Sequence, residues 1–407
     1  MTFASNAGPD RINDMSSSAM LAVHVKNFAD IATAYGTWFA EAFLDAVCHR
    51  VTECLARDGI SVLTHGDHRF IVAGPLADHK LVDAMFAAAG STPIIINDIP
   101  VLPALSVLDA NAIFMVKPPV SRLDSAQYRT LMPVAVSTYN ALVTKRMLLT
   151  FQPIRSADLD AELYCEGSAQ ITSGELGEGP IELGEVLPMI ERLHLVRLLD
   201  HTVVHQTVAM LRLFPSSRLG CNISAQSAVG DERWSSLFSI LQAEPRIAER
   251  FVIGITVTSS LPDLAAAQAF LRDLQKLGCQ VAISGFGAGS ISISEVAALG
   301  PDIVKIDGAF LRRYIGQIFG GDFLRSLNSL AACVASTVVL EGVDDEECLQ
   351  LSRQIGVRWL QGHHIKAASV SIMELGFGIH HPACPLGLGA GPTKVPWTSQ
   401  RSQLYHR

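Results

Sequence analysis

Residues 262–284 read PDLAAAQAFLRDLQKLGCQVAIS, which predicts one helix followed at once by one strand. Pro262-Asp263 is a helix-start pair, and Gly278 supplies the left-handed residue that ends a helix. The residues expected on the buried face of this helix are Ala267, Phe270, Leu271, Leu274 and Leu277. The strand Gln280–Ile283 follows directly, and the strand Asp302–Ile306 comes about one helix later. Strand and helix alternate in this way to the end of the region, which favours a TIM-like parallel (β/α) barrel over an open sheet.

Polar residues recur at the ends of the predicted strands from about residue 150 onward. Functional side chains of a parallel barrel gather at the carboxyl ends of its strands. The ends in question are Cys165–Ser168, Cys221–Ser224, Gly254–Val257, Ser284–Gly287, Lys305–Asp307, Glu341–Val343 and Gln361–Gly362. Divalent cations such as magnesium prefer oxygen ligands, several of them anionic. Glycine, serine and valine stand at three of these ends instead of acidic residues. The sequence therefore predicts a site with fewer carboxylates than divalent cations would need as ligands.

The bulk composition narrows the range of partners. The 407 residues are enough for two domains, and 49% of them are apolar and 17% charged. A formal net charge of −8 disfavours a nucleic-acid polymer, although a small anionic ligand is still compatible with a locally positive pocket. The eight cysteines show no CxxC spacing, and we find neither a signal peptide nor an apolar run of about 20 residues. We therefore expect a cytoplasmic protein with reduced thiols and no membrane insertion.

The chain divides into five segments. We expect a disordered N-terminus over 1–17, a smaller α/β domain with an open sheet over 18–116, a linker with one helix over 117–148, a barrel over 149–378 and a disordered tail over 379–407. The linker helix is expected from about Ser125 to Lys145. The strands expected in the first domain are Met20–Val25, Ser61–Leu63 and Phe70–Ala73, and two more apolar runs follow at Pro93–Ile96 and Leu105–Leu108. A helix between the first two carries an apolar face made of Phe39, Phe43, Leu44, Val47, Val51 and Leu55.

Seven short motifs of the second domain, in order, resemble the EAL domain of bacterial cyclic di-GMP signalling. They are Phe151–Ile154, Glu166–Ser168, Leu183–Glu191 with a helix down to Asp200, Asn222–Ser224, Lys305–Asp307, Glu341–Val343 and Gln361–Gly362. The resemblance spans about 230 residues. It implies a (β/α) barrel that, in its active form, hydrolyses cyclic di-GMP with two divalent cations.

The first domain resembles the GGDEF cyclase domain, which often precedes EAL. Leu21–Gly36 is similar to its first strand and loop, and Gly66–Phe70 to its signature turn. The resemblance implies metal-binding carboxylates on that strand and in that turn, where this chain has His24, Lys26 and His68-Arg69. At the family's inhibitory site Arg57 is present, but Ile60 replaces the acid. We therefore expect no cyclase activity.

The barrel also departs from the pattern that its resemblance implies. The remnants of the family's metal site are Glu166, Asn222 and Glu341, and Lys305 matches the lysine that positions the attacking water; the lost acids correspond to Gly254, Ser284 and Gly285. We therefore expect no catalytic residues, no bound metal and no cofactor. Magnesium or manganese would be required only if residual phosphodiesterase activity exists.

Binding a ligand requires fewer specific residues than catalysing its hydrolysis. The residues expected to line a cyclic di-GMP site are Gln152, Glu166, Asn222, Lys305, Glu341 and Gln361. A lysine that ends an apolar strand must be paired, and Glu166 and Glu341 are the expected partners of Lys305. Such pairing fits a binding pocket and a purely internal salt-bridge network equally well. Gln170 replaces an arginine that grips the ligand in the family, and His363-His364 are expected to be ordinary loop residues.

Two interpretations follow, and the sequence favours the first only slightly. In the first, the chain is an inactive cyclic di-GMP effector that acts through an unidentified protein partner. In the second, it is an adaptor that uses the barrel as a protein-binding surface without the ligand. A residual phosphodiesterase is a third, weaker interpretation. A homodimer is compatible with all three, and the roles of the first domain and the tail stay open.

Overall fold

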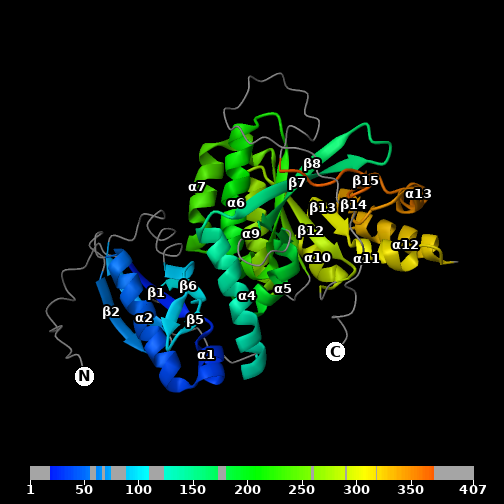
Figure 1. The fold of residues 1–407 in the computed structure, drawn as a ribbon. Helices are drawn as coiled ribbons and strands as arrows, with labels where there is room; N and C mark the ends of the chain where they lie inside the picture. The colour runs from blue at the N-terminus through cyan, green and yellow to red at the C-terminus, as the bar shows by residue number, and fades with distance from the viewer. Residues whose placement is uncertain are drawn as a thin grey trace, which may run out of the picture.

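The computed structural model describes residues 19–55, 61–66, 69–74, 89–109, 123–172, 180–257, 261–288, 291–317 and 319–370. They form a smaller N-terminal domain and a larger barrel, with helix α4 (Ser125–Val143) between them (Figure 1). The predicted N-terminus over 1–17 and tail over 379–407 lie outside the described residues, as do Arg57, Ile60 and His68.

The first domain contains an open four-stranded sheet in the order β2-β3-β1-β6, in which every neighbouring pair is antiparallel. Its strands are β1 (Ala19–Val25), β2 (Ser61–Gly66), β3 (Arg69–Gly74) and β6 (Leu105–Asp109). Two helices, α1 (Phe28–Tyr35) and α2 (Thr37–Leu55), complete it. The predicted apolar face of α2 is buried at Phe39, Phe43, Leu44, Val47 and Val51, as expected. Strand β2 extends to Gly66, beyond the predicted strand end at Leu63.

The apolar run over residues 93–96 lies outside this sheet. Instead, β4 (Ile94–Ile96) pairs with β5 (Ile99–Val101) in a separate hairpin. Asn97 and Asp98 connect the two with positive φ angles of 49° and 60°. Asn and Asp tolerate this conformation, and a two-residue turn of this kind matches the twist of the strands it joins. The local turn therefore outweighs pairing with the larger sheet.

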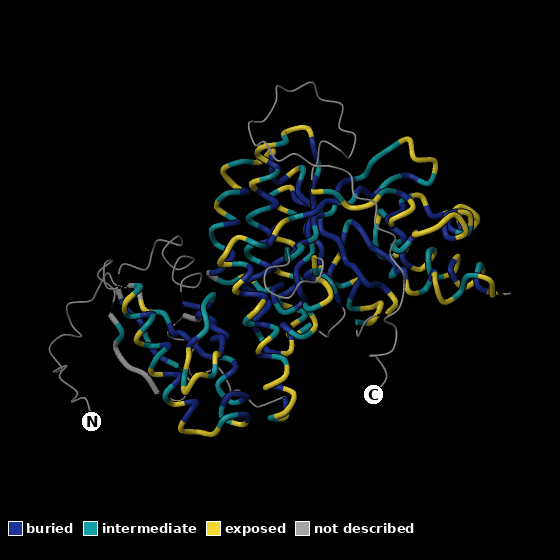
Figure 2. Tube along the Cα trace, in the orientation of Figure 1, coloured by how far each residue is buried: buried dark blue, intermediate teal, exposed yellow. Residues whose placement is uncertain are grey.

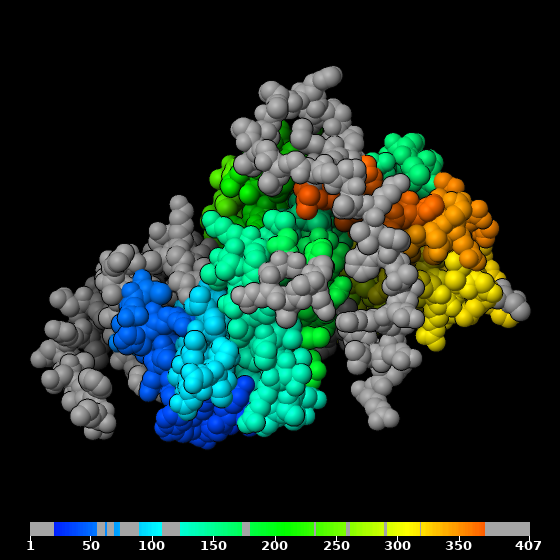
Figure 3. Space-filling model, in the orientation of Figure 1, coloured from blue at the N-terminus to red at the C-terminus, as the bar shows by residue number. Residues whose placement is uncertain are grey.

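Helix α4 contacts both domains. Asp124 caps its first turn by accepting a hydrogen bond from Gln127 N (2.8 Å). Near its start, Tyr128 OH accepts a hydrogen bond from Asn27 Nδ2 of the first domain (3.1 Å). Further along, Tyr139 OH donates to the carbonyl of Leu195 in the barrel domain. The space-filling view shows the first domain packed along α4 (Figure 3), so this helix is part of the domain junction.

Eight strands close the barrel because β8 pairs with both β7 and β10. They are β7 (Met147–Ser156), β8 (Glu162–Ile171), β10 (Leu219–Ser224), β11 (Phe251–Thr256), β12 (Gln280–Phe286), β13 (Ile303–Ile306), β14 (Thr337–Leu340) and β15 (Trp359–Leu360). A short strand, β9 (Ile181–Glu182), flanks β8. The strands form a buried centre, and the covering helices expose their outer faces (Figure 2).

The helices around the barrel follow the predicted alternation. They are α5 (Leu183–Arg192), α6 (Val196–Leu213), α7 (Ser235–Ala243), α8 (Pro245–Ala248), α9 (Leu264–Lys276), α10 (Ile293–Leu299), α11 (Gly308–Tyr314), α12 (Gly320–Ala332) and α13 (Glu346–Ile355). Helix α9 starts after Asp263, whose side chain accepts from Ala266 N, and it is followed by Gly278 with φ +102°. Its predicted buried face is confirmed except at Leu277, which is only partly buried.

Two predictions about the barrel are wrong in detail. The strands are not all parallel, because β7 runs antiparallel to both β8 and β15. The short connection between Ser156 and Glu162 makes β7 and β8 a hairpin, which requires opposite strand directions. The helix expected to run down to Asp200 is also longer than predicted, because α6 continues to Leu213. His194, with φ +59°, lies between α5 and α6.

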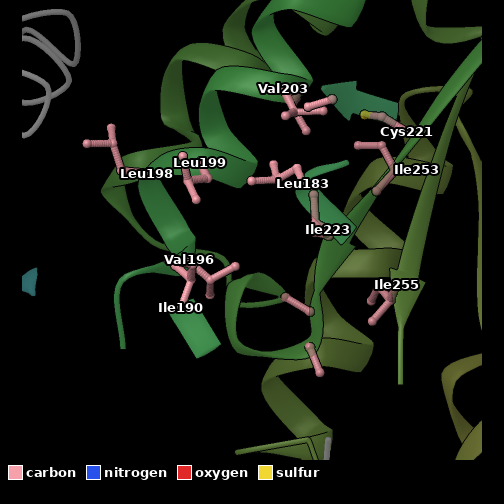
Figure 4. Close-up of a cluster of buried hydrophobic side chains, with 14 of the residues drawn as sticks. Leu183, Ile190, Val196, Leu198, Leu199, Val203, Cys221, Ile223, Ile253 and Ile255 are labelled. Carbon is pink, nitrogen blue, oxygen red and sulfur yellow. The ribbon is translucent and has the colours of Figure 1, made fainter. Parts of the chain in front are cut away.

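Helices α5 and α6 cover strands β10 and β11 through an apolar cluster. The residues of this cluster include Leu183, Ile190, Val196, Leu199, Val203, Cys221, Ile223, Ile253 and Ile255 (Figure 4). Helix α6 packs against β10, the strand that carries Asn222. Its first turn, at Arg197 and Leu198, lies near Ala104 and Leu105 of the first domain.

Candidate functional site

The centre of the barrel mouth is the side chain of Lys305, which lies on β13 and is fully buried. Its Nζ lies 2.6 Å from Glu166 Oε2 and 2.7 Å from Glu341 Oε1. The predicted pairing of Lys305 is thus confirmed. Glu166 comes from the middle of β8, which extends beyond the strand end that the sequence suggested, and Glu341 directly follows β14.

The pKa values of Lys305 and Glu341 are both raised from their ordinary values. Burial alone would lower the pKa of Lys305, but Glu166 and Glu341 raise it above its ordinary value. For Glu341, burial raises the pKa, and the lysine opposes that shift. A charged lysine held between two carboxylates is the arrangement that best offsets the cost of burying all three groups.

Amide side chains extend this network towards β7 and β15. Gln361 Nε2 donates to Glu166 Oε1 (3.3 Å) and to Gln152 Oε1 (3.2 Å). Gln152 Nε2 in turn donates to the carbonyl of Lys366 (3.1 Å). Gln361 is 7% exposed, and its Oε1 is buried with no hydrogen-bond partner. Five of the six predicted pocket residues therefore meet at this side of the mouth.

Asn222, the sixth predicted residue, lies on the opposite side of the mouth with the positions that lack acid. Asn222 and Gly254 are paired residues on β10 and β11. A Cβ atom at position 254 would overlap Asn222 Oδ1, so the amide lies across the glycine. Ser284 on β12 donates to Asn222 Oδ1 (3.3 Å). Gly285, which follows it, adopts φ +82° and has no side chain to contribute. This side of the mouth is neutral.

A surface hollow of about 250 Å³ opens beside the charged network. Its lining residues are Gln152, Glu341, Gly342, Asp344, Gln361, Gly362 and His363. The volume is close to the lower end of small-molecule pockets, at about 300 Å³. His363 lies outside the helices and strands and lines the hollow, where its Nδ1 lies 3.1 Å from Asp344 Oδ1. His364 pairs with Glu346 and does not line the hollow.

Two site residues had not been predicted. Asp344 follows the Glu341–Val343 motif directly, and its carboxylate contacts His363. Tyr164, two residues before Glu166 on β8, donates to Glu166 Oε2 (3.3 Å) and is buried. Both lie within three residues of a motif that the sequence did single out. Closeness to those motifs is the signal that could have identified them.

The residues at the mouth do not fit a pair of divalent cations. Glu166 and Glu341 are both engaged by Lys305, and Asn222 Oδ1 already accepts from Ser284. Within the described part of the chain, no group of three or more His, Cys, Asp or Glu side chains is arranged to hold a metal ion. Two divalent cations would add about four positive charges to the mouth. Lys305 already balances one of the two carboxylates there.

A closed eight-stranded β/α barrel with one antiparallel strand and a charged mouth defines the class of this protein. The family model described as "EAL domain" matches residues 136–368, which is more than half of the chain. The chain therefore belongs to the EAL domain family of cyclic di-GMP signalling proteins. EAL phosphodiesterases use magnesium or manganese. The match begins at residue 136, so the resemblance of residues 18–116 to GGDEF stays a prediction.

Curated relatives and solved structures agree with this assignment. The chain is 30% identical over 184 residues to "Cyclic di-GMP phosphodiesterase PdeF" of Escherichia coli K12, a match that covers 44% of this chain and 24% of that one. It is 26% identical over 227 residues to "Probable cyclic di-GMP phosphodiesterase PdeA" of the same organism, covering 54% and 30%. The matched region is thus under a third of the length of either relative.

Two solved structures share the barrel fold. An EAL domain protein from Listeria monocytogenes EGD-e is 23% identical, with a TM-score of 0.50, over 58% of this chain and 93% of that one. The FimX EAL domain of Xanthomonas citri in complex with c-di-GMP is 20% identical, with a TM-score of 0.51, over 60% and 97%. None of the described helices is long and apolar enough to cross a membrane.

Proposed function

We propose that the barrel binds cyclic di-GMP without hydrolysing it, and that the chain acts as an effector through a protein partner. The observation that supports this proposal is the side of the mouth without acids, where Gly254, Ser284 and Gly285 stand at the positions that the resemblance assigns to carboxylates. On the other side, Lys305 Nζ lies within 2.7 Å of both remaining carboxylates and balances part of their charge. The mouth is then suited to recognition by hydrogen bonds rather than to metal-assisted hydrolysis.

The hollow beside Lys305 favours one part of the ligand. Gln361 Oε1 is a buried acceptor without a partner, which is costly unless a donor reaches it. Glu341 and Asp344 add further acceptors and repel phosphate. A guanine edge carries N–H donors that match these groups. We therefore expect a guanine base of cyclic di-GMP, rather than a phosphate, to occupy the hollow. The ligand-binding residues are then Gln152, Glu166, Asn222, Lys305, Glu341 and Gln361, and none of them has a catalytic role.

A ligand-independent adaptor is the second candidate, and a surface patch favours it. The α11–α12 aromatic patch consists of Phe310, Tyr314, Phe319 and Phe323. The rings of Tyr314 and Phe323 stack at 4.2 Å, while Phe319 is 77% exposed. Gln170, which stands where the family has a ligand-gripping arginine, instead donates to Glu182 Oε1 (3.1 Å). Aromatic side chains are enriched in protein interfaces, and an adaptor needs such a surface.

Calorimetric titration of the full chain with cyclic di-GMP, with and without magnesium, tests the proposal. We expect binding that does not depend on the metal, and no linear dinucleotide by chromatography. Gln361→Ala should weaken binding by up to about tenfold, because it removes one neutral hydrogen-bonding group. Gln275→Ala is the matched control, since Gln275 Nε2 bonds the carbonyl of Gly300 on the outside of the barrel (2.9 Å).

The other outcomes separate the alternatives. A flat titration at high micromolar ligand would contradict the effector and leave the adaptor, with its search for a protein partner. Metal-dependent formation of the linear product would contradict the loss of activity and establish a residual phosphodiesterase that uses Glu166, Asn222 and Glu341.

A further inference from the structure

The hairpin between β7 and β8 carries an exposed acidic tip. Asp158, Leu159 and Asp160 are consecutive exposed residues at this tip, which lies at the edge of the barrel (Figure 1). Ser156 Oγ donates to Asp160 Oδ1 (2.7 Å), and the backbone N–H of Leu159 donates to the carbonyl of Ser156 (2.8 Å). The turn is therefore closed by its own hydrogen bonds and presents two carboxylates to solvent.

Two exposed arginines lie beside this tip. Arg353, in the last turn of α13, donates from Nε and Nη2 to the carbonyl of Ala157 (3.0 and 2.9 Å), which joins α13 to the hairpin. Arg358 directly precedes β15, and its Cζ lies 5.0 Å from the ring centroid of Trp359. A guanidinium that stacks on an aromatic ring keeps the N–H groups at its edge available for a carboxylate.

An open hollow of about 630 Å³ lies between these two pairs of charges. We call its lining residues the hairpin surface: Ser156, Ala157, Asp158, Asp160, Ala161, Arg353 and Arg358. Within the described part of the chain, neither of its aspartates forms an ion pair with either of its arginines. The hairpin surface shares no residue with the hollow at the mouth, which lies at the other end of β15.

The charges of the hairpin surface are complementary to themselves. In a dimer with a twofold axis the same patch of both subunits meets, and each contact occurs twice with the roles exchanged. Carboxylates of one subunit can then approach the guanidinium groups of the other, and the reverse contact forms across the axis. A phosphate would be repelled by the two carboxylates and a simple cation by the two arginines. A second copy of the chain offers both signs of charge at the required positions.

Leu159 at the tip gives a second, independent indication of an interface. Its φ angle of +65° lies in the left-handed region, which a leucine rarely adopts, and its side chain is 41% exposed. The tip therefore combines an unfavourable backbone conformation with an apolar side chain in water. Burial of that side chain against another molecule would offset both costs.

We propose that the hairpin surface is the interface of a homodimer, in which the β7–β8 tip of each subunit enters the hollow of the other. The aspartates of the entering tip face Arg353 and Arg358, and Leu159 is covered between the subunits. The contact is small, so the dimer is weak and depends on concentration. The interface contains no residue of the barrel mouth or of the α11–α12 aromatic patch, and the inference does not depend on the function proposed for the mouth.

Sedimentation velocity of the full chain, from micromolar to submillimolar concentration, tests the proposal. We expect monomer and dimer in equilibrium, with less dimer at high salt because the paired charges are exposed. Arg358→Glu should raise the dissociation constant of the dimer by about tenfold or more, because it places like charges opposite one another on both sides of the axis. Asp158→Arg should have an effect of the same direction and similar size.

Exchange of the two signs provides the sharper test. The chain that carries both Arg358→Glu and Asp158→Arg again has two charges of each sign on the hairpin surface, so it should recover the dimer. Lys276→Glu is the matched control, since Lys276 is an exposed lysine of α9 outside the hairpin surface, and it should leave the equilibrium unchanged. Leu159→Gly should weaken the dimer by about tenfold, because the apolar side chain is lost while the left-handed conformation is retained.

Three results would overturn the proposal. A chain that stays monomeric over the whole concentration series does not use this surface for a second copy. A dimer that persists undiminished in both Arg358→Glu and Asp158→Arg has its interface elsewhere. Failure of the doubly exchanged chain to recover the dimer, with circular dichroism unchanged, contradicts the pairing of opposite charges. All the substituted side chains are exposed, so the variants are expected to fold.

Discussion

The barrel mouth and the domain junction each place a lysine among charged groups, but the pKa values of the two lysines shift in opposite directions. At the mouth, the carboxylates of Glu166 and Glu341 raise the pKa of Lys305 although burial alone would lower it. At the junction, burial and two arginines lower the pKa of Lys26 to about 8, and Asp231 opposes them. Both environments are buried, so the number of counter-charges decides the direction of the shift.

The two lysines differ in the charges of their neighbours. At the mouth Lys305 is matched by two carboxylates of the chain, which lie within 2.7 Å of its Nζ. At the junction two arginines and one carboxylate act on the charge of Lys26.

The largest expected effect comes from breaking the balance at the mouth. Lys305→Met leaves Glu166 and Glu341 close together and without a counter-charge. We expect the free energy of unfolding to fall by about 3–5 kcal/mol, measured by urea denaturation. Lys305→Met combined with Glu341→Gln should recover part of this loss, because one of the two charges is removed. A loss below about 1 kcal/mol in the single variant would show that the network does not stabilise the barrel.

A smaller effect on the free energy of unfolding is expected at Asp200, which is bonded to Ser224 at the end of β10 and interacts with Arg197. Asp200 is buried on α6, where it accepts from Ser224 N (2.9 Å) and from Ser227 Oγ (2.5 Å), and Arg197 acts on its charge. Burial raises the pKa of its carboxyl to about 7 from an ordinary 3.8. Between these values the folded chain binds more protons than the unfolded chain, so stability falls as pH rises through this window.

The pH dependence can be measured directly. From pH 5 to pH 7 we expect this group to reduce the free energy of unfolding by about 2–3 kcal/mol. Asp200→Asn removes the titration, and its stability should depend less on pH over the same range. Parallel curves for the two proteins would mean that Asp200 is not the group responsible.

The neutral side of the mouth should respond more weakly. In Gly254→Ala the added methyl group displaces the Asn222 amide and breaks its contact with Ser284. We expect a loss of about 1–2 kcal/mol in urea denaturation, which is the range for overpacking a filled site. The same substitution in an Asn222→Ala background should cost less, since the overlap is gone. Equal costs in both backgrounds would contradict the position of Asn222 across Gly254.

The smallest effect is expected for an exposed lysine with a partner of its own. Lys276 Nζ lies 2.8 Å from Asp273 Oδ1 on α9, but its side chain is 73% exposed. Lys276→Met should change the free energy of unfolding by no more than about 0.5 kcal/mol. It is the matched control for Lys305→Met, because both remove one lysine from an ion pair. A change as large as that of Lys305→Met would show that burial is not the cause of the larger effect.

Local sequence signals predicted much of the barrel and part of its site. The helix over 264–276 and the strand after it followed from apolar spacing, a start pair and Gly278. The pairing of Lys305 followed from the cost of a buried lysine, since few acids were available to balance it. Strand direction was missed at β7, because the hairpin turn contains no glycine and Leu159 takes the left-handed conformation instead (φ +65°).

By itself, the sequence predicted a barrel whose mouth holds one lysine and two carboxylates, and the structure brings these three side chains together. These features depend on residue type and on short-range spacing, which a sequence displays directly. Only the tertiary structure decided that Asn222 lies across Gly254 and that Lys26, Arg197 and Arg233 meet at one junction. The cationic residues of that junction lie up to 207 positions apart, counted from Lys26 to Arg233, and only the packing of the two domains through α4 brings their charges together.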